Sequence, residues 1–132
     1  KAEQLGGAMA FAFTESGPFV GFDLDDVKAD GEFTEEARTI VQRLNSYTEV
    51  SSSGTGLHVI AEGEKLDDRK TEGVLSTCGH LEVYDTDRYF VLTGDVYNGS
   101  TSVKSRPTVV REVQDDYLPN GRRSPSQASK SL

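Results

Sequence analysis

The sequence lacks several features that would assign it to a specialised class. Its 132 residues include one cysteine, Cys78, so no intrachain disulfide can form, which agrees with a reducing compartment. No apolar run approaches the roughly 18 residues needed to span a membrane, and the first residues do not show the pattern of a signal segment. There is no Cys/His zinc module, Walker-type loop or internal repeat. We therefore expect one soluble, cytoplasmic domain with a modest core.

Positive charge is also scarce, with 14 Lys and Arg residues against 22 Asp and Glu residues and a formal net charge of -8. Nucleic acid is itself an anion and is usually bound through Lys and Arg. The balance therefore indicates either a protein that does not touch nucleic acid or one that works at high salt. At about 1 M salt the Debye length falls to roughly 3 Å and long-range repulsion is screened. Composition leaves both possibilities open, including a halophilic source.

Two aspartates two residues apart, Asp23 and Asp25, stand out within an apolar run. Side chains alternate between the faces of a strand, so both carboxylates project from one surface while Phe22 and Leu24 project from the other. A pair of carboxylates is a common ligand set for Mg²⁺, which points to phosphoryl or nucleotidyl transfer. Taken alone, the pattern is more typical of a solvated strand end.

The first half of the chain predicts two strands and a helix. The strands are expected at 8–13 and 19–25, and Asp30-Gly31 interrupts the chain after them. Thr34 is the expected N-cap of a helix. Its apolar positions at helical spacing are Ala37, Ile40, Val41, Leu44 and Tyr47.

The second half predicts further strands and a second helix. In order, we expect a small-residue loop at 51–56, a strand at 57–62, a hairpin of strands 81–85 and 89–93, and a helix at 107–117. Residues 1–118 would form the folded core, and residues 119–132 are polar enough to be a disordered tail or linker. This order predicts an α+β fold with a mixed or antiparallel sheet, helices on one face and the other face open.

A third carboxylate is predicted on the open face. If Leu81 and Val83 face the core, Glu82 lies on the opposite side, where it can join Asp23 and Asp25. Three carboxylates can hold two metal ions, the arrangement that stabilises the attacking and leaving oxygens of an in-line displacement.

Groups suited to phosphate lie in two other segments. The loop at 51–56 offers backbone N–H groups without bulky side chains, and His58, just after it, adds a donor. Arg88 can make forked contacts with phosphate oxygens.

At these residues the chain resembles the archaeo-eukaryotic primase superfamily, in particular the bifunctional primase-polymerases of phages, plasmids and archaea. Three motifs carry the resemblance: Asp23-Leu24-Asp25, then Ser53-Gly54-Thr55-Gly56-Leu57-His58, then Glu82-Val83-Tyr84-Asp85 running through Arg88 to Gly94. It covers roughly residues 8–97, and the third segment is the most specific.

The resemblance implies the family's RRM-like catalytic core and a metal-dependent, template-directed nucleotidyltransferase in the replication of a mobile element or archaeal replicon. Its partners would be nucleoside triphosphates, a DNA template and primer, and a replicative helicase domain or protein. Asp23, Asp25 and Glu82 would be catalytic and would hold two Mg²⁺ or Mn²⁺ ions. The residues implied in nucleotide binding are Ser53, Thr55, Gly56, His58 and Arg88.

Two departures from the family pattern bear on this expectation. Gly56 stands where the family often has serine, so a hydroxyl contact must come from Ser53 or Thr55 or be missing. About twenty residues precede Asp23, whereas family members usually carry another strand-bearing segment there, so three interpretations stay open: a fragment with an N-terminally truncated core, a truncated gene or a minimal form.

Two other functions remain open. One is a non-catalytic remnant of the fold that binds nucleotide or single-stranded nucleic acid. The other is a metal-dependent nuclease or phosphohydrolase that uses Asp23, Asp25 and His58.

Overall fold

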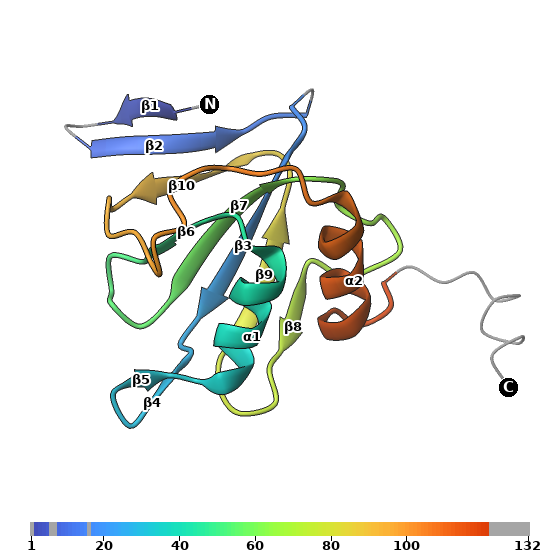
Figure 1. Ribbon diagram of the computed structural model, residues 1–132. Coiled ribbons are helices and arrows are strands. Elements are labelled where there is room, and N and C mark those ends of the chain that lie inside the picture. The colour runs from blue at the N-terminus through green and yellow to red at the C-terminus, as the bar shows by residue number, and fades with distance from the viewer. Residues whose placement is uncertain (1, 6–7, 16, 122–132) are drawn as a thin grey trace, which may run out of the picture.

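Strand β3 (Phe19–Asp25) lies at the centre of the fold (Figure 1). The computed structural model describes residues 2–5, 8–15 and 17–121. In β3, Phe22 and Leu24 are fully buried, whereas Asp23 and Asp25 are partly exposed. This alternation is what a strand with one face on a core requires.

Four further strands join β3 in a five-stranded antiparallel sheet with the order β6-β7-β3-β9-β8. Their bounds are Tyr47–Val50 for β6, Leu57–Glu62 for β7, Glu72–Val74 for β8 and His80–Tyr84 for β9. The strands predicted at 19–25 and 57–62 are confirmed residue for residue by β3 and β7.

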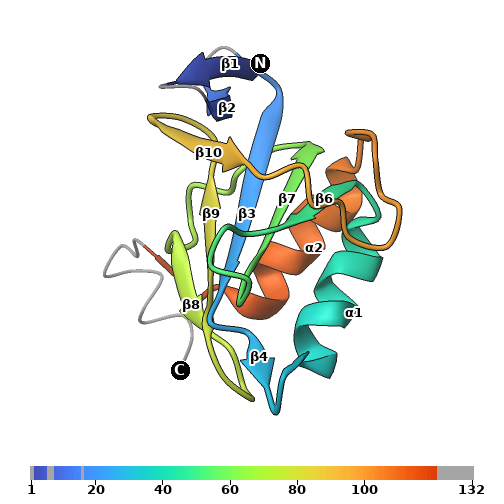
Figure 2. The same ribbon diagram turned by 90° about the vertical axis from the view of Figure 1, so that its left-hand side faces the viewer.

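Helices α1 (Glu35–Leu44) and α2 (Pro107–Tyr117) both cover one face of this sheet (Figure 2). The Thr34 hydroxyl oxygen caps α1 by accepting a hydrogen bond of 3.1 Å from the Ala37 N–H. The apolar residues that α1 and α2 bury against β3, β7 and β9 include Ala37, Ile40, Val41, Leu44, Val110 and Val113. The predicted α+β class, with helices on one face of an antiparallel sheet, is confirmed.

The predicted extension of the first helix through Tyr47 is wrong. Asn45 follows α1 with φ 45, in the left-handed region, and its N–H closes the helix on the Val41 carbonyl at 2.9 Å. Asparagine tolerates this conformation and ends helices for that reason. Tyr47 instead begins β6, opposite Ile60 of β7.

A short hairpin links β3 to α1. Its strands are β4 (Lys28–Ala29) and β5 (Glu32–Phe33). Asp30 and Gly31 form the turn, both with positive φ, which fits the predicted break at these two residues.

A second sheet lies over part of the face opposite the helices (Figure 1). It contains β1 (Ala2–Leu5), β2 (Ala8–Phe13) and β10 (Arg88–Leu92), in the order β1-β2-β10. This sheet packs aromatic rings onto the first one, so the face expected to be open is open over only part of its area. The residues of this second apolar cluster are Phe11, Phe13, Ile60, Tyr84 and Phe90.

The predicted hairpin between strands 81–85 and 89–93 is wrong in its pairing. Both strands exist as β9 and β10, but β9 pairs with β3 and β8, whereas β10 pairs with β2. Both edges of β9 are thus occupied, and β10 crosses to place Phe90 opposite Phe11. The hairpin was predicted because the two strands are close in the sequence. In the structure, packing of the aromatic rings of β2 and β10 favours the pairing of β10 with β2 instead.

The chain after α2 runs back along the loop before β8. The Lys70 N–H donates to the Pro119 carbonyl at 3.0 Å, and the Gly121 N–H donates to the Asp68 carbonyl at 2.8 Å. Of the predicted tail at 119–132, residues 119–121 therefore bond to the domain, and residues 122–132 lie outside the described residues. Within the described part of the chain, no helix has the length and apolar character to cross a membrane.

Candidate active site

A row of charged side chains crosses all five strands on the face opposite the helices. Strand register places Glu49 opposite His58, His58 opposite Asp23, Asp23 opposite Glu82, and Glu82 opposite Glu72. Residues directly opposite one another in antiparallel strands share a face and have neighbouring side chains. The structure therefore brings together three of the predicted residues, from three different strands, and adds Glu49 and Glu72.

Asp25 lies one step further along β3, opposite His80 of β9. The His80 Nε2 is 3.6 Å from the Asp25 Oδ2 and 3.3 Å from the Glu72 Oε2. Ligand atoms of Glu72, His80 and Glu82 all lie within 4.8 Å of one another. Asp23, Asp25 and Glu82 share the face but do not form so tight a group among the described residues. Neither Glu72 nor His80 was predicted as a ligand.

His58 is held between two carboxylates. Its Nε2 is 3.5 Å from the Asp23 Oδ1 and its Nδ1 is 3.9 Å from the Glu49 Oε2, while its ring stacks on Phe90 with centroids 4.3 Å apart. Burial opposes the charged form, but Asp23 and Glu49 outweigh it and raise the pKa of His58 to about 9. His58 is therefore a cation at neutral pH, the state that attracts a phosphate.

The small-residue loop is ordered by its own hydroxyl groups. The Oγ atoms of Ser51 and Ser53 are 3.0 Å apart, and the Ser53 Oγ is 3.0 Å from the Thr55 Oγ1. The N–H of Thr55 donates to Ser53 and that of Gly56 to Ser51, so these two donors, which the sequence offered to phosphate, are used within the loop.

Gly56 fixes the loop against the end of β3. A Cβ at this position would lie 2.6 Å from the Leu24 carbonyl oxygen, so serine, which the family often has here, does not fit without movement of the backbone. The hydroxyl groups left to contact a nucleotide are then those of the exposed Ser53 and the half-buried Thr55. The Thr55 carbonyl accepts from the Val27 N–H at 3.0 Å, which holds this end of the loop beside the end of β3.

Arg88 stands at the border of the row. Its guanidinium lies 4.0 Å from the centroid of the Tyr84 ring, which belongs to the same face of β9 as Glu82. Burial and the nearby Glu82 carboxylate raise the pKa of Tyr84, so the phenol stays neutral. Arg88 itself is exposed and can reach a ligand over the row.

Glu49 is the main residue that the sequence did not reveal. Its side chain is 0% exposed, and it accepts hydrogen bonds from the Tyr47 hydroxyl at 2.7 Å and the Thr93 N–H at 3.0 Å. Burial opposes its ionisation, but His58 and these donors outweigh burial and hold its pKa below the usual value. Nothing between Tyr47 and Val50 marks Glu49 as buried, because the adjacent polar residues Thr48 and Glu49 are both buried and the segment does not alternate.

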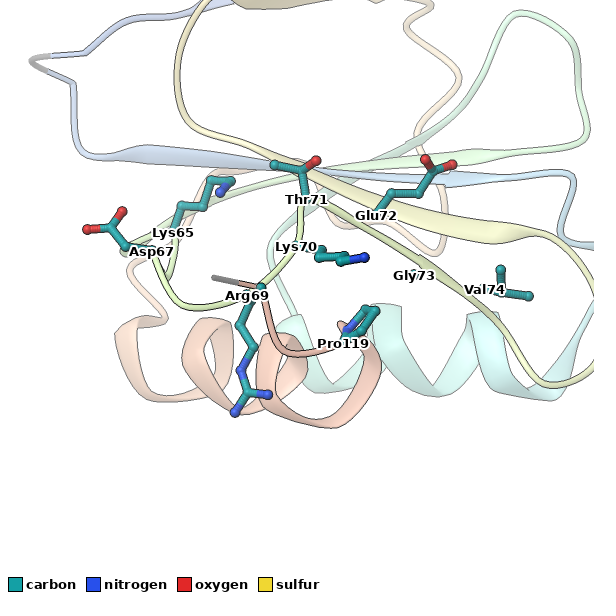
Figure 3. A pocket seen from close by; sticks show the side chains of 10 residues that line it. Lys65, Asp67, Arg69, Lys70, Thr71, Glu72, Gly73, Val74 and Pro119 are labelled. Carbon is teal, nitrogen blue, oxygen red and sulfur yellow. The ribbon is translucent and has the colours of Figure 1, made fainter. Parts of the chain in front are cut away.

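A groove of about 970 Å³ follows the outer edge of β8 and reaches the end of the row, since Glu72 is among the residues that line it (Figure 3). It gathers Lys65, Arg69 and Lys70, but Arg69 is paired with Asp115 at 2.8 Å. Figure 3 shows the Glu72 side chain pointing away from Lys70. The Lys70 ammonium therefore does not face the Glu72 carboxylate.

The fold and this face define an RRM-like α+β domain with an acidic, histidine-containing site on its sheet. No family model matches the chain. Over 98 residues, 73% of its length, the chain is 39% identical to the DNA primase-polymerase of Nitratiruptor phage NrS-1. The chain belongs to the primase-polymerase family. It spans 14% of the phage protein's length.

Proposed function

We propose that this chain is the nucleotide-incorporating core of a DNA primase-polymerase, a metal-dependent and template-directed nucleotidyltransferase. The observation that carries the proposal is the register that sets Asp23 between His58 and Glu82. One side of Asp23 then offers a cation for phosphate and the other a second carboxylate for metal, as transfer of a nucleotide requires.

The metal ions would bind between β3 and β9, held by Asp23, Asp25 and Glu82. The donor set fits hard divalent cations, since it consists of carboxylates on one partly exposed face. Mg²⁺ or Mn²⁺ bound there would neutralise the triphosphate and activate the 3′ hydroxyl. Glu72 and His80 lie beside this set, and the imidazole favours Mn²⁺ over Mg²⁺.

The triphosphate would lie across His58 and the loop at 51–56. His58 carries a positive charge at neutral pH in the metal-free protein, Thr55 and Ser53 offer hydroxyl groups, and Arg88 would approach from the β10 side. These groups bind and orient the phosphates, so catalysis would consist of positioning and charge neutralisation.

The DNA template and primer would approach over the same face. The net charge of -8 repels a polyanion, so bound metal or elevated salt must offset the repulsion. Binding of DNA should therefore weaken strongly when divalent ions are removed.

The test is primer extension by the purified chain with Mn²⁺ or Mg²⁺, comparing the wild type with Asp23→Asn. We expect loss of at least about a hundredfold in rate, because the charge of a metal ligand is removed. Asp26→Asn is the matched control, since Asp26 is exposed, lies next to the pair and has φ 54, which asparagine tolerates. Extension that survives Asp23→Asn would contradict the proposal.

The same assay separates the other two functions. Shortened primer in place of extended primer would identify a nuclease. Nucleotide binding by calorimetry without any incorporation would identify a binding remnant of the fold.

A further inference from the structure

A fully buried carboxylate in a sheet requires a physical explanation. Glu49 lies in the edge strand β6, and its side chain is 0% exposed. Burial of an unpaired carboxylate is costly, so such a group persists only where partners satisfy it. The partners of Glu49 therefore indicate what it does.

These partners come from three segments that surround the site. The Tyr47 hydroxyl donates to Oε1 at 2.7 Å, and the Thr93 N–H, just after β10, donates to Oε2 at 3.0 Å. The third partner is His58 of β7, whose Nδ1 lies 3.9 Å from the same Oε2. The carboxylate thus ties the end of β10 to the histidine of the site.

The His58 ring is constrained on every side that the structure describes. Glu49 faces Nδ1, Asp23 faces Nε2 at 3.5 Å, and Phe90 of β10 stacks on the ring at 14° between planes. Rotation of the ring by half a turn would replace a nitrogen beside each carboxylate with a carbon. The two carboxylates therefore select one orientation, in which Nε2 points along the row toward β3.

We propose that Glu49 is a positioning residue for nucleotide binding, which holds the His58 ring so that Nε2 is directed at the triphosphate beside Asp23. This inference rests on the proposed function. Glu49 touches neither substrate nor metal; it acts through His58 and through the Thr93 contact that keeps Phe90 over the ring. A residue with a merely structural role would stabilise the sheet without affecting how tightly nucleotide binds.

The test is a double-mutant cycle on Glu49→Gln and His58→Asn, with primer extension at varied dATP concentration and fixed Mn²⁺. Glutamine keeps the shape of the side chain and removes its charge. We expect Glu49→Gln to raise KM for dATP about tenfold, the effect of removing the buried charge that faces the His58 Nδ1 at 3.9 Å, with kcat changed less than about threefold. In the His58→Asn background, Glu49→Gln should have no further effect on KM.

Tyr47→Phe is the matched control, because it removes one hydrogen bond to Glu49 and leaves the charge and His58 in place. Its KM should stay within about twofold of the wild type. If Glu49→Gln does not fold, Glu49→Asp takes its place in the cycle, since it keeps the charge and withdraws it from His58. The shorter side chain should raise KM in the same direction, and only while His58 is present.

The outcomes distinguish failure of the proposed function from failure of the positioning role of Glu49. No incorporation by the wild type would overturn the proposed function and this inference with it. Incorporation by the wild type, with an unchanged KM in Glu49→Gln or an equal rise in KM in the His58→Asn background, would overturn the positioning role alone.

Discussion

The two faces of the five-stranded sheet use alternate residues of the same strands for opposite purposes. On the helix side, Phe22 and Leu81 are fully buried in the core. On the other side, their neighbours Asp23 and Glu82 form the charged row. One strand therefore supplies stability and chemistry at adjacent positions, so the two can be separated by single substitutions.

The charged face is itself divided into two parts. Rings from β2 and β10 cover the part around Gly21, whereas the part around Asp23 stays accessible. Phe90 belongs to the cover and also stacks on His58, so the second sheet forms one wall of the site. Because the second sheet covers His58, this histidine is buried enough for the neighbouring carboxylates to shift its pKa.

The largest difference between the two faces is expected in how much a substitution lowers the free energy of unfolding. Phe22→Ala should lower the free energy of unfolding by about 3 to 5 kcal/mol, because it leaves a cavity at the centre of the core. Asp25→Asn, on the opposite face of β3, should change it by less than about 1 kcal/mol. Urea denaturation followed by circular dichroism measures both, and equal losses would contradict the division between faces.

A smaller loss is expected where the second sheet touches the first. A Cβ at Gly21 would lie 2.4 Å from the Phe13 ring and 2.8 Å from the Phe90 ring. Gly21→Ala should therefore cost about 1 to 3 kcal/mol through overpacking. Combining it with Phe13→Leu should recover part of the loss. An unchanged free energy of unfolding in Gly21→Ala would contradict close packing of the Phe13 and Phe90 rings on Gly21.

The pH dependence of stability provides a third comparison. The pKa of His58 is raised from 6.5 to about 9, so the stability from its charged form is complete below pH 6.5 and is lost as pH rises toward 9. Unfolding by urea in metal-free buffer should show a decline over this range, and His58→Gln should lack it. The same decline in His58→Gln would assign the effect to other groups.

The smallest effect is expected at Arg88. Arg88→Ala should raise KM for nucleotide about fivefold, because a forked phosphate contact is lost at an exposed position. The free energy of unfolding should change by about 1 kcal/mol at most, the value of an exposed cation–π contact with Tyr84. Arg88→Lys should recover only part of the affinity, since lysine cannot make the fork. Unchanged KM in both variants would remove Arg88 from the site.

Local patterns predicted the elements that local chemistry determines. The alternation from Phe19 to Asp25 and the Thr34 cap were sufficient for β3 and the start of α1, and Pro107 marked the start of α2. The face shared by Asp23 and Glu82 also followed from alternation, because strand periodicity is strict.

What could not be predicted depends on contacts distant in the chain. Pairing of β10 with β2 is set by aromatic packing between residues far apart, so the nearer hairpin was favoured wrongly. Tyr47 continues the helical spacing of α1, and the left-handed Asn45 ends the helix before this residue is reached. Glu49 was missed because nothing in its sequence context indicates that a carboxylate is buried.

The most direct test of the account is where Mn²⁺ binds on the 14.4 kDa chain, measured by paramagnetic broadening of amide signals. The account predicts that low Mn²⁺ concentrations broaden the amides around Asp23 and Glu82 first, and that Asp23→Asn combined with Glu82→Gln abolishes the effect. Broadening centred on the groove of Lys65 and Lys70, or unchanged broadening in the double variant, would contradict a metal site on the charged face.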